Sequence, residues 1–210
     1  MIRRGEVHGV TGTTARARNG DIELAFERAG PAGGEPLLLI MGLGMTVAIE
    51  HPHRVRSLTS VMSTPSPRIG RPTLGAAAAL AARPGRTAEE AAQRVVETFR
   101  VIGSPGYPLD EDWLRDYARR AFARSTDPTG TRRQLAAINA SPSRVAGLRT
   151  VRVPTLVVHG EADPLVRPEA GRATAAAVPG ARLVTYPGMG HNLPRELWPS
   201  IVRQVAAVVR

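Results

Sequence analysis

Residues 154–168 read PTLVVHGEADPLVRP, and this stretch decides which fold the chain is expected to adopt. Its first part, 155–160, is an almost continuous apolar run, as in a parallel strand that is covered on both faces. A polar loop carrying Asp163 follows, and 168–178 has the composition of a helix. A strand, a polar loop and a helix form the repeating unit of a parallel α/β sheet.

The same unit recurs on both sides of this stretch. Downstream, ARLVTY (181–186) is a predicted strand, PGMGHNLP (187–194) is a loop with His191, and 194–210 is a closing helix. Upstream, we predict strands over 21–27, 37–41 and 55–64, with a short helix after residue 45 that Pro52 stops. Between 65 and 145, prolines separate helical segments without any strand, near 74–82, 88–101, 111–124 and 130–140.

These elements predict one α/β core with a helical insertion. We expect residues 1–64 to form the N-terminal part of the core, 65–147 a helical cap and 148–210 the C-terminal part of the core. The 210 residues are enough for one such domain. The expected sheet is mostly parallel and carries helices on both faces.

Asp163 and His191 are the candidate functional residues, because each follows a strand. Functional side chains of open parallel sheets gather at the carboxyl ends of the strands. A carboxylate and a histidine on successive loops can form a pair in which the carboxylate orients the imidazole as a general base. Each residue alone also has a plainer explanation, since Asp before Pro is common in turns and glycine-rich loops can carry a histidine without function.

Several stretches resemble a known family. HGEADPLV (159–166) and GMGHNLP (188–194) resemble the acid and histidine loops of α/β-hydrolases. Four further stretches are similar to the esterase branch of this family, which includes aclacinomycin methylesterase. They are LLLIMGLGM, AIEHPHRVRSLTSVMST, GSPGYPLDEDWLR and LPRELWPSIV. The resemblance implies that Asp163 is the catalytic acid, His191 the catalytic histidine and the Leu43 amide an oxyanion-hole donor. It also implies that the helical cap covers a small-molecule ester.

The nucleophile that this family requires is missing. It is a serine in G-x-S-x-G on a strand-to-helix turn that precedes the acid. No such motif occurs in the chain, and Ser104 in GSPGYP has the wrong spacing. By resemblance, about 80 residues, including central strands and the nucleophile, are absent between Met45 and Thr46. Thr46 and Ser63 remain as conceivable substitutes, and we expect a weakly stable, inactive protein.

Composition bears on the other classes of function. The net charge of +10 comes from arginines scattered along the chain, so a nucleic-acid partner is not favoured, although a basic nucleic-acid-associated protein stays an alternative. There is no cysteine, and we expect no cofactor and no metal site, the pair His51 and His53 included. No apolar run of about 18 residues and no signal-peptide core are visible, so we expect a cytoplasmic protein without a membrane partner. The remaining alternative is a non-catalytic binder of an apolar, ester-like ligand, and the oligomeric state is open.

Overall fold

A computed structural model describes the backbone of residues 13–19, 22–28, 44–124 and 128–209, and the side chains of 44–124, 130 and 132–209. Contacts divide the chain into two units, Met1–Leu39 and Ile40–Arg210. In the first unit, β1 (Thr13–Asn19) pairs antiparallel with β2 (Ile22–Arg28), with Asn19 opposite Ile22. The sequence predicted β2 but not β1. The predicted strand 37–41 lies outside the described residues.

The described residues of the second unit form a three-stranded parallel sheet in the order β3-β4-β5. The strands are β3 (Leu58–Val61), β4 (Thr155–Gly160) and β5 (Arg182–Tyr186). β4 lies in the middle and is buried along its whole length, as its apolar sequence predicted. β3 is shorter than the predicted strand over 55–64. It pairs with β4 from Leu58 to Val61, and Met62 then turns into a positive φ of 43°, which ends the strand.

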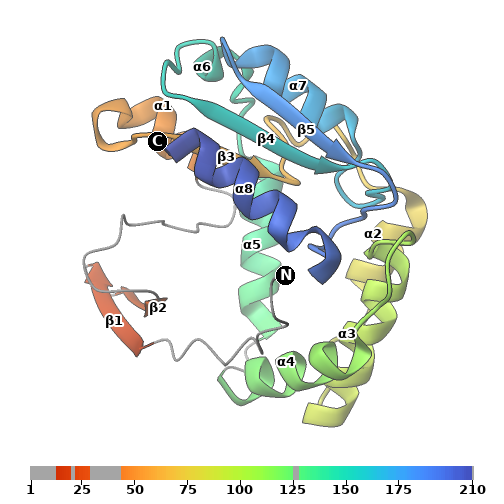
Figure 1. Ribbon diagram of the computed structural model, residues 1–210. Helices are drawn as coiled ribbons and strands as arrows, with labels where there is room; N and C mark the ends of the chain where they lie inside the picture. Colours follow the sequence, from red (N-terminus) through yellow and green to blue (C-terminus); the bar gives the residue numbers. More distant parts are fainter. Residues whose placement is uncertain (1–12, 20–21, 29–43, 125–127, 210) are drawn as a thin grey trace, which may run out of the picture. The chain divides into compact units, whose positions relative to one another are not determined.

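Helices cover both faces of this sheet (Figure 1). They are α1 (Gly44–Glu50), α6 (Val145–Leu148) and α7 (Glu169–Ala177) on one face, and α8 (Trp198–Val209) on the other. Side chains alternate along β4, so Leu156 and Val158 pack towards α8, whereas His159 points towards α7. Gly171 of α7 touches the His159 ring so closely that a Cβ there would lie 2.6 Å from Nδ1. The helix therefore packs directly against the strand end that leads to Asp163.

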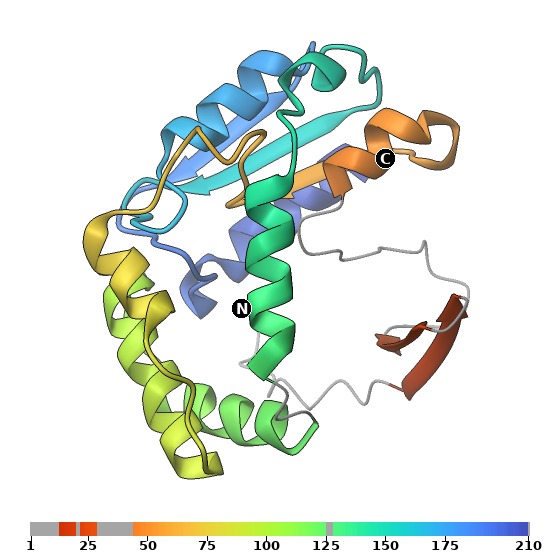
Figure 2. The same ribbon diagram turned by 180° about the vertical axis from the view of Figure 1, so that it is seen from behind.

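The helical insertion has the elements that its proline breaks predicted. They are α2 (Leu74–Ala81), α3 (Ala88–Ile102), α4 (Glu111–Arg124) and α5 (Pro128–Ala140). The Thr87 hydroxyl accepts a hydrogen bond from the Glu90 amide and caps α3, and Asp110 accepts one from the Trp113 amide at the start of α4. α3 packs against α2 and α4 (Figure 2). The division at 64 and 147 stays a prediction.

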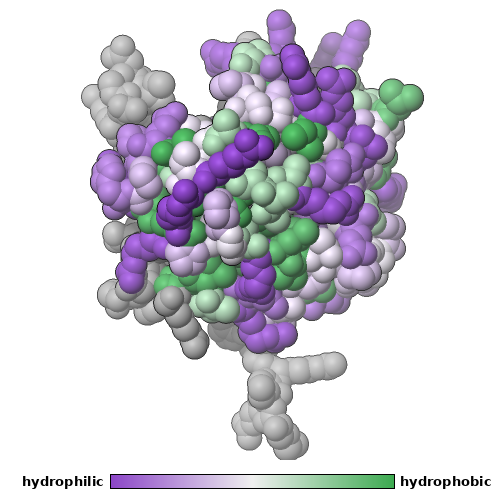
Figure 3. Space-filling view, turned by 90° about the horizontal axis from the view of Figure 1, so that it is seen from above, coloured by the Kyte–Doolittle hydropathy of each residue, from purple (hydrophilic) through white to green (hydrophobic). Residues whose placement is uncertain are grey.

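Arginine side chains are spread over the surface of the second unit. Figure 3 shows strongly hydrophilic residues scattered around and across one face, with hydrophobic residues between them. Several arginines are neutralised locally, for example Arg119, which contacts Glu89 through two hydrogen bonds. No helix in the described part of the chain is long and apolar enough to cross a membrane.

We predict that replacing Leu156 with alanine lowers the free energy of unfolding by about 2–5 kcal/mol, because its side chain is fully buried between β4 and α8. Leu74 is the matched control, since its side chain is 92% exposed and Leu74→Ala removes the same atoms from water. Urea denaturation of both variants measures the difference. Equal midpoints for the two variants would contradict the position of the core.

Candidate active site

The candidate site lies at the carboxyl ends of β4 and β5, where two loops approach each other. The loop after β4 carries Asp163, and the loop after β5 carries His191. The Ala162 amide donates to the Met189 carbonyl at 2.9 Å, and a Cβ on Gly160 would lie 2.2 Å from that same carbonyl. Glycine is therefore required at the end of β4 for the two loops to come this close.

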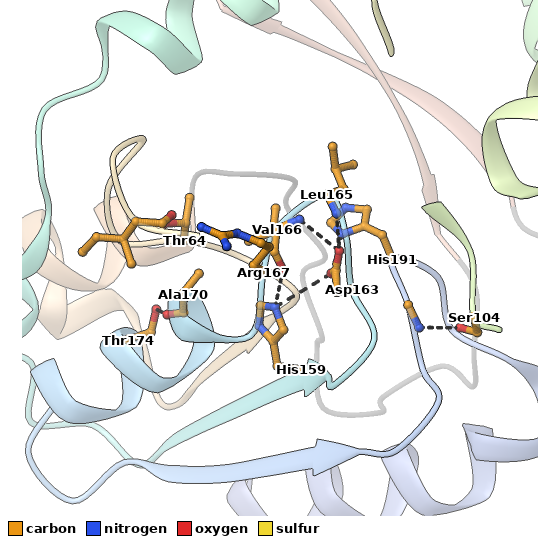
Figure 4. Close-up of polar contacts among 12 residues, drawn as sticks. Thr64, Ser104, His159, Asp163, Leu165, Val166, Arg167, Ala170, Thr174 and His191 are labelled. Carbon is orange, nitrogen blue, oxygen red and sulfur yellow. Dashed lines mark hydrogen bonds and ion pairs between the residues drawn. The ribbon is translucent and has the colours of Figure 1, made fainter. Parts of the chain in front are cut away.

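Asp163 and His191 form a hydrogen-bonded pair (Figure 4). Asp163 Oδ2 lies 2.7 Å from His191 Nδ1. Asp163 Oδ1 accepts hydrogen bonds from the amides of Leu165 and Val166, both at 2.9 Å. The carboxylate is fully buried, whereas the His191 side chain is 25% exposed. The acid is thus held rigidly inside the loop while the imidazole remains accessible.

This arrangement determines which nitrogen of His191 can accept a proton. An ionised carboxylate only accepts hydrogen bonds, so Nδ1 carries the hydrogen of the neutral imidazole. Nε2 then has a free lone pair, and it makes no hydrogen bond to any residue that the structure describes. An imidazole in this state is a general base that can take a proton from water or from an alcohol.

His159 stabilises the pair indirectly, through Val166 of the acid loop. Its ring is completely buried at the end of β4, and Nε2–H donates to the Val166 carbonyl at 2.7 Å, so it fixes the segment whose amide binds Asp163. His159 Nε2 is 3.8 Å from Asp163 Oδ2, and Nδ1 has no hydrogen-bond partner among the described residues. Burial lowers the pKa of His159, although the Val166 carbonyl and Asp163 oppose this effect. The ring is therefore neutral at pH 7, and Asp163 remains available to His191.

The other predicted candidates are placed as follows. Leu43, the expected oxyanion-hole donor, lies outside the described residues. Thr46 is in α1 and Ser63 follows β3, and neither has a hydrogen bond to His191 within the described ranges. Ser104, which the sequence excluded as a nucleophile, lies beside the histidine loop, where its hydroxyl contacts Gly190 and Asn192. The sequence did not reveal this contact.

The chain is similar to proteins of one family. The family model for the alpha/beta hydrolase fold matches residues 42–194. Rhodomycin D methylesterase of Streptomyces peucetius is 31% identical over 132 residues, which cover 61% of this chain and 43% of that protein. A second rhodomycin D methylesterase, from a Streptomyces species, is 30% identical over the same shares of both chains. This chain thus matches less than half the length of these relatives.

Solved structures agree with the fold. The enol-lactonase of Burkholderia xenovorans superimposes with a TM-score of 0.60 at 23% identity, over 80% of this chain and 62% of that one. A meta-cleavage product hydrolase of Pseudomonas fluorescens gives a TM-score of 0.55 at 17% identity, over 80% and 59%. The predicted fold class, with a parallel sheet covered on both faces, is confirmed, and so is the resemblance to the methylesterase branch. The catalytic roles of Asp163 and His191 stay predictions.

We predict a pH dependence of stability from His159. Because burial lowers its pKa from the ordinary value of 6.5, the unfolded chain binds a proton at a pH where the folded chain does not. The free energy of unfolding should therefore be highest above pH 6.5 and fall below it, by at most about 1.4 kcal/mol per pH unit for one group, until the folded-state pKa is reached.

His159→Gln tests this expectation, because the glutamine amide can still donate to the Val166 carbonyl but does not titrate. His53→Gln is the control, since His53 is exposed. Urea denaturation between pH 5 and pH 8 should show a shallower slope for His159→Gln than for the unmodified chain or the control. An unchanged slope in His159→Gln would show that another group is responsible.

Proposed function

Because the chain belongs to the alpha/beta hydrolase fold family, we propose that it is a methylesterase-like carboxylic-ester hydrolase that has lost its nucleophile and is inactive as it stands. The observation that carries the proposal is the pair of Asp163 and His191 at 2.7 Å, combined with the absence of G-x-S-x-G from the sequence. The acid and the base of a catalytic triad are present, and the group that they would activate is not.

The preserved pair supports an origin in ester hydrolysis. In acyl transfer by a triad, the histidine removes the proton of the serine hydroxyl and later returns it to the leaving group. Asp163 and His191 follow β4 and β5 in the chain order that this fold uses, acid before histidine. Two relatives at about 30% identity are named methylesterases, which favours a methyl ester as the ancestral substrate.

The region around α1 is where we place the loss. The segment 37–45 resembles the oxyanion-hole strand and loop, and α1 with β3 resembles the end of the nucleophile helix and the strand after it. In the sequence, the two resembling segments meet at Met45 and Thr46, with no stretch between them that could supply a strand and a nucleophile turn. A deletion of about 80 residues at Met45 and Thr46 accounts for the missing serine and for a sheet with only three strands among the described residues.

Without the nucleophile, little catalysis is expected. A base such as His191 with a bound ester can still activate water, but triads that lack one member retain only a small part of their rate. A hydroxyl must lie about 3 Å from the imidazole nitrogen to be activated, and the described residues offer none at His191 Nε2. Thr46 and Ser63 are therefore not proposed as nucleophiles.

A second candidate function is non-catalytic binding of an apolar, ester-like ligand. An open pocket of about 380 Å³ lies beside the site, between the end of α3, the start of the following loop and the acid loop. Phe99, Tyr107 and Leu109 line it together with Ala162 and Pro164, which flank Asp163. Calorimetry with an aromatic methyl ester distinguishes this function from a chain that neither binds nor hydrolyses esters. Saturable binding without turnover, weakened in Tyr107→Ala, would favour the binding function.

We predict that a fluorophosphonate, which modifies activated serine and threonine hydroxyls, forms no covalent adduct with the chain. Intact-mass spectrometry after incubation measures the outcome, with an active serine hydrolase treated in parallel as the positive control. A His191→Ala sample shows whether any adduct depends on the base. Stoichiometric labelling of Thr46 or Ser63 that disappears in His191→Ala would contradict the loss of the nucleophile.

A further inference from the structure

We infer that Ser104 is a positioning residue that holds the histidine loop from the side of the helical insertion. Its hydroxyl accepts a hydrogen bond from the Gly190 amide at 2.8 Å and donates one to Asn192 Oδ1 at 2.5 Å. The two partners are the residues immediately before and after His191. Ser104 is separated from them by more than 80 positions in the sequence, and Figure 4 shows it beside the loop that carries His191.

The rest of the α3 terminus reinforces this contact. The His191 amide donates to the Ile102 carbonyl at 2.8 Å, and the Gly106 amide donates to the Gly188 carbonyl at 3.0 Å. A Cβ on Gly190 would lie 1.9 Å from the Gly103 carbonyl oxygen, so only glycine permits this approach. The backbone of the histidine loop is thus attached directly to residues 102–106.

These attachments matter because Asp163 fixes only one atom of the imidazole. Asp163 binds Nδ1 from within its own loop, whereas the position of the His191 backbone depends on the contacts to Ile102 and Ser104. A catalytic group must be held within about 0.5 Å of its productive position, and neighbouring hydrogen bonds provide that restraint. Of these contacts, those made by the Ser104 hydroxyl are the ones that a single side-chain replacement can remove.

The same geometry excludes a nucleophilic role for Ser104. Its hydroxyl proton is donated to Asn192, and its oxygen accepts the Gly190 amide, so the group is engaged away from His191 Nε2. The hydroxyl orients the loop and takes no part in proton transfer. The inference rests on the proposed function only in treating His191 as the base, since its test reads the imidazole itself and requires no turnover.

The experiment follows the Nδ1 proton of His191 in the full-length chain by nitrogen-15 NMR, with the signal assigned from its loss in His191→Gln. Ser104→Ala removes both hydrogen bonds, and Ser104→Thr keeps a hydroxyl. Ser141→Ala is the matched control, because the Ser141 hydroxyl donates to the Ala137 carbonyl at an exposed helix end. We expect exchange of the His191 proton with water to become about tenfold faster in Ser104→Ala. Ser104→Thr and Ser141→Ala should behave like the unmodified chain.

The inference would be overturned if the His191 proton exchanged at the same rate in Ser104→Ala as in the unmodified chain. It would also be overturned if Ser104→Thr accelerated the exchange as much as Ser104→Ala does. If Ser104→Ala does not fold, Asn192→Ala tests the inference through one of the two hydrogen bonds, because it removes the acceptor of the Ser104 hydroxyl and keeps the bond from the Gly190 amide. Faster exchange in Asn192→Ala supports the inference, and unchanged exchange there overturns it. A fluorophosphonate adduct would contradict the proposed function and leave this result unaffected.

Discussion

The hydrogen bond between Asp163 Oδ2 and His191 Nδ1 is the interaction on which the candidate site depends. It can form only because β4 and β5 are adjacent and parallel, so that both loops leave the sheet at the same edge. On one side, the buried Asp163 carboxylate is held by the amides of Leu165 and Val166. The neutral ring of His159 holds that segment in turn, through the Val166 carbonyl. The end of α3 holds the histidine on the other side.

Much of the fold was predictable, because strands β4 and β5 and helices α3 and α4 carry strong local signals. The apolar run of β4, the Thr87 cap and the proline breaks are properties of short segments. β1 was missed because its alternating threonine, alanine and arginine residues give little apolar contrast. The length of β3 depends on its pairing with β4, which no local pattern shows.

The site was partly predictable for the same reason. Asp163 and His191 each follow a recognisable strand, so their position at one edge of the sheet could be inferred from sequence order. The Ser104 contacts to Gly190 and Asn192 could not, because they join the helical insertion to a distant loop and each residue type is common in turns. The close approach of Gly190 to Gly103 is likewise visible only in three dimensions.

The central claim is that a formed acid and base pair lacks a group to activate. Steady-state hydrolysis of an activated ester by the chain and by His191→Ala tests this claim most directly, because the variant removes the base while Asp163 and the fold are retained. The account predicts equal rates that barely exceed the rate without protein. The claim would be contradicted if the unmodified chain were at least about a hundredfold faster than His191→Ala, because general-base catalysis contributes a factor of that size.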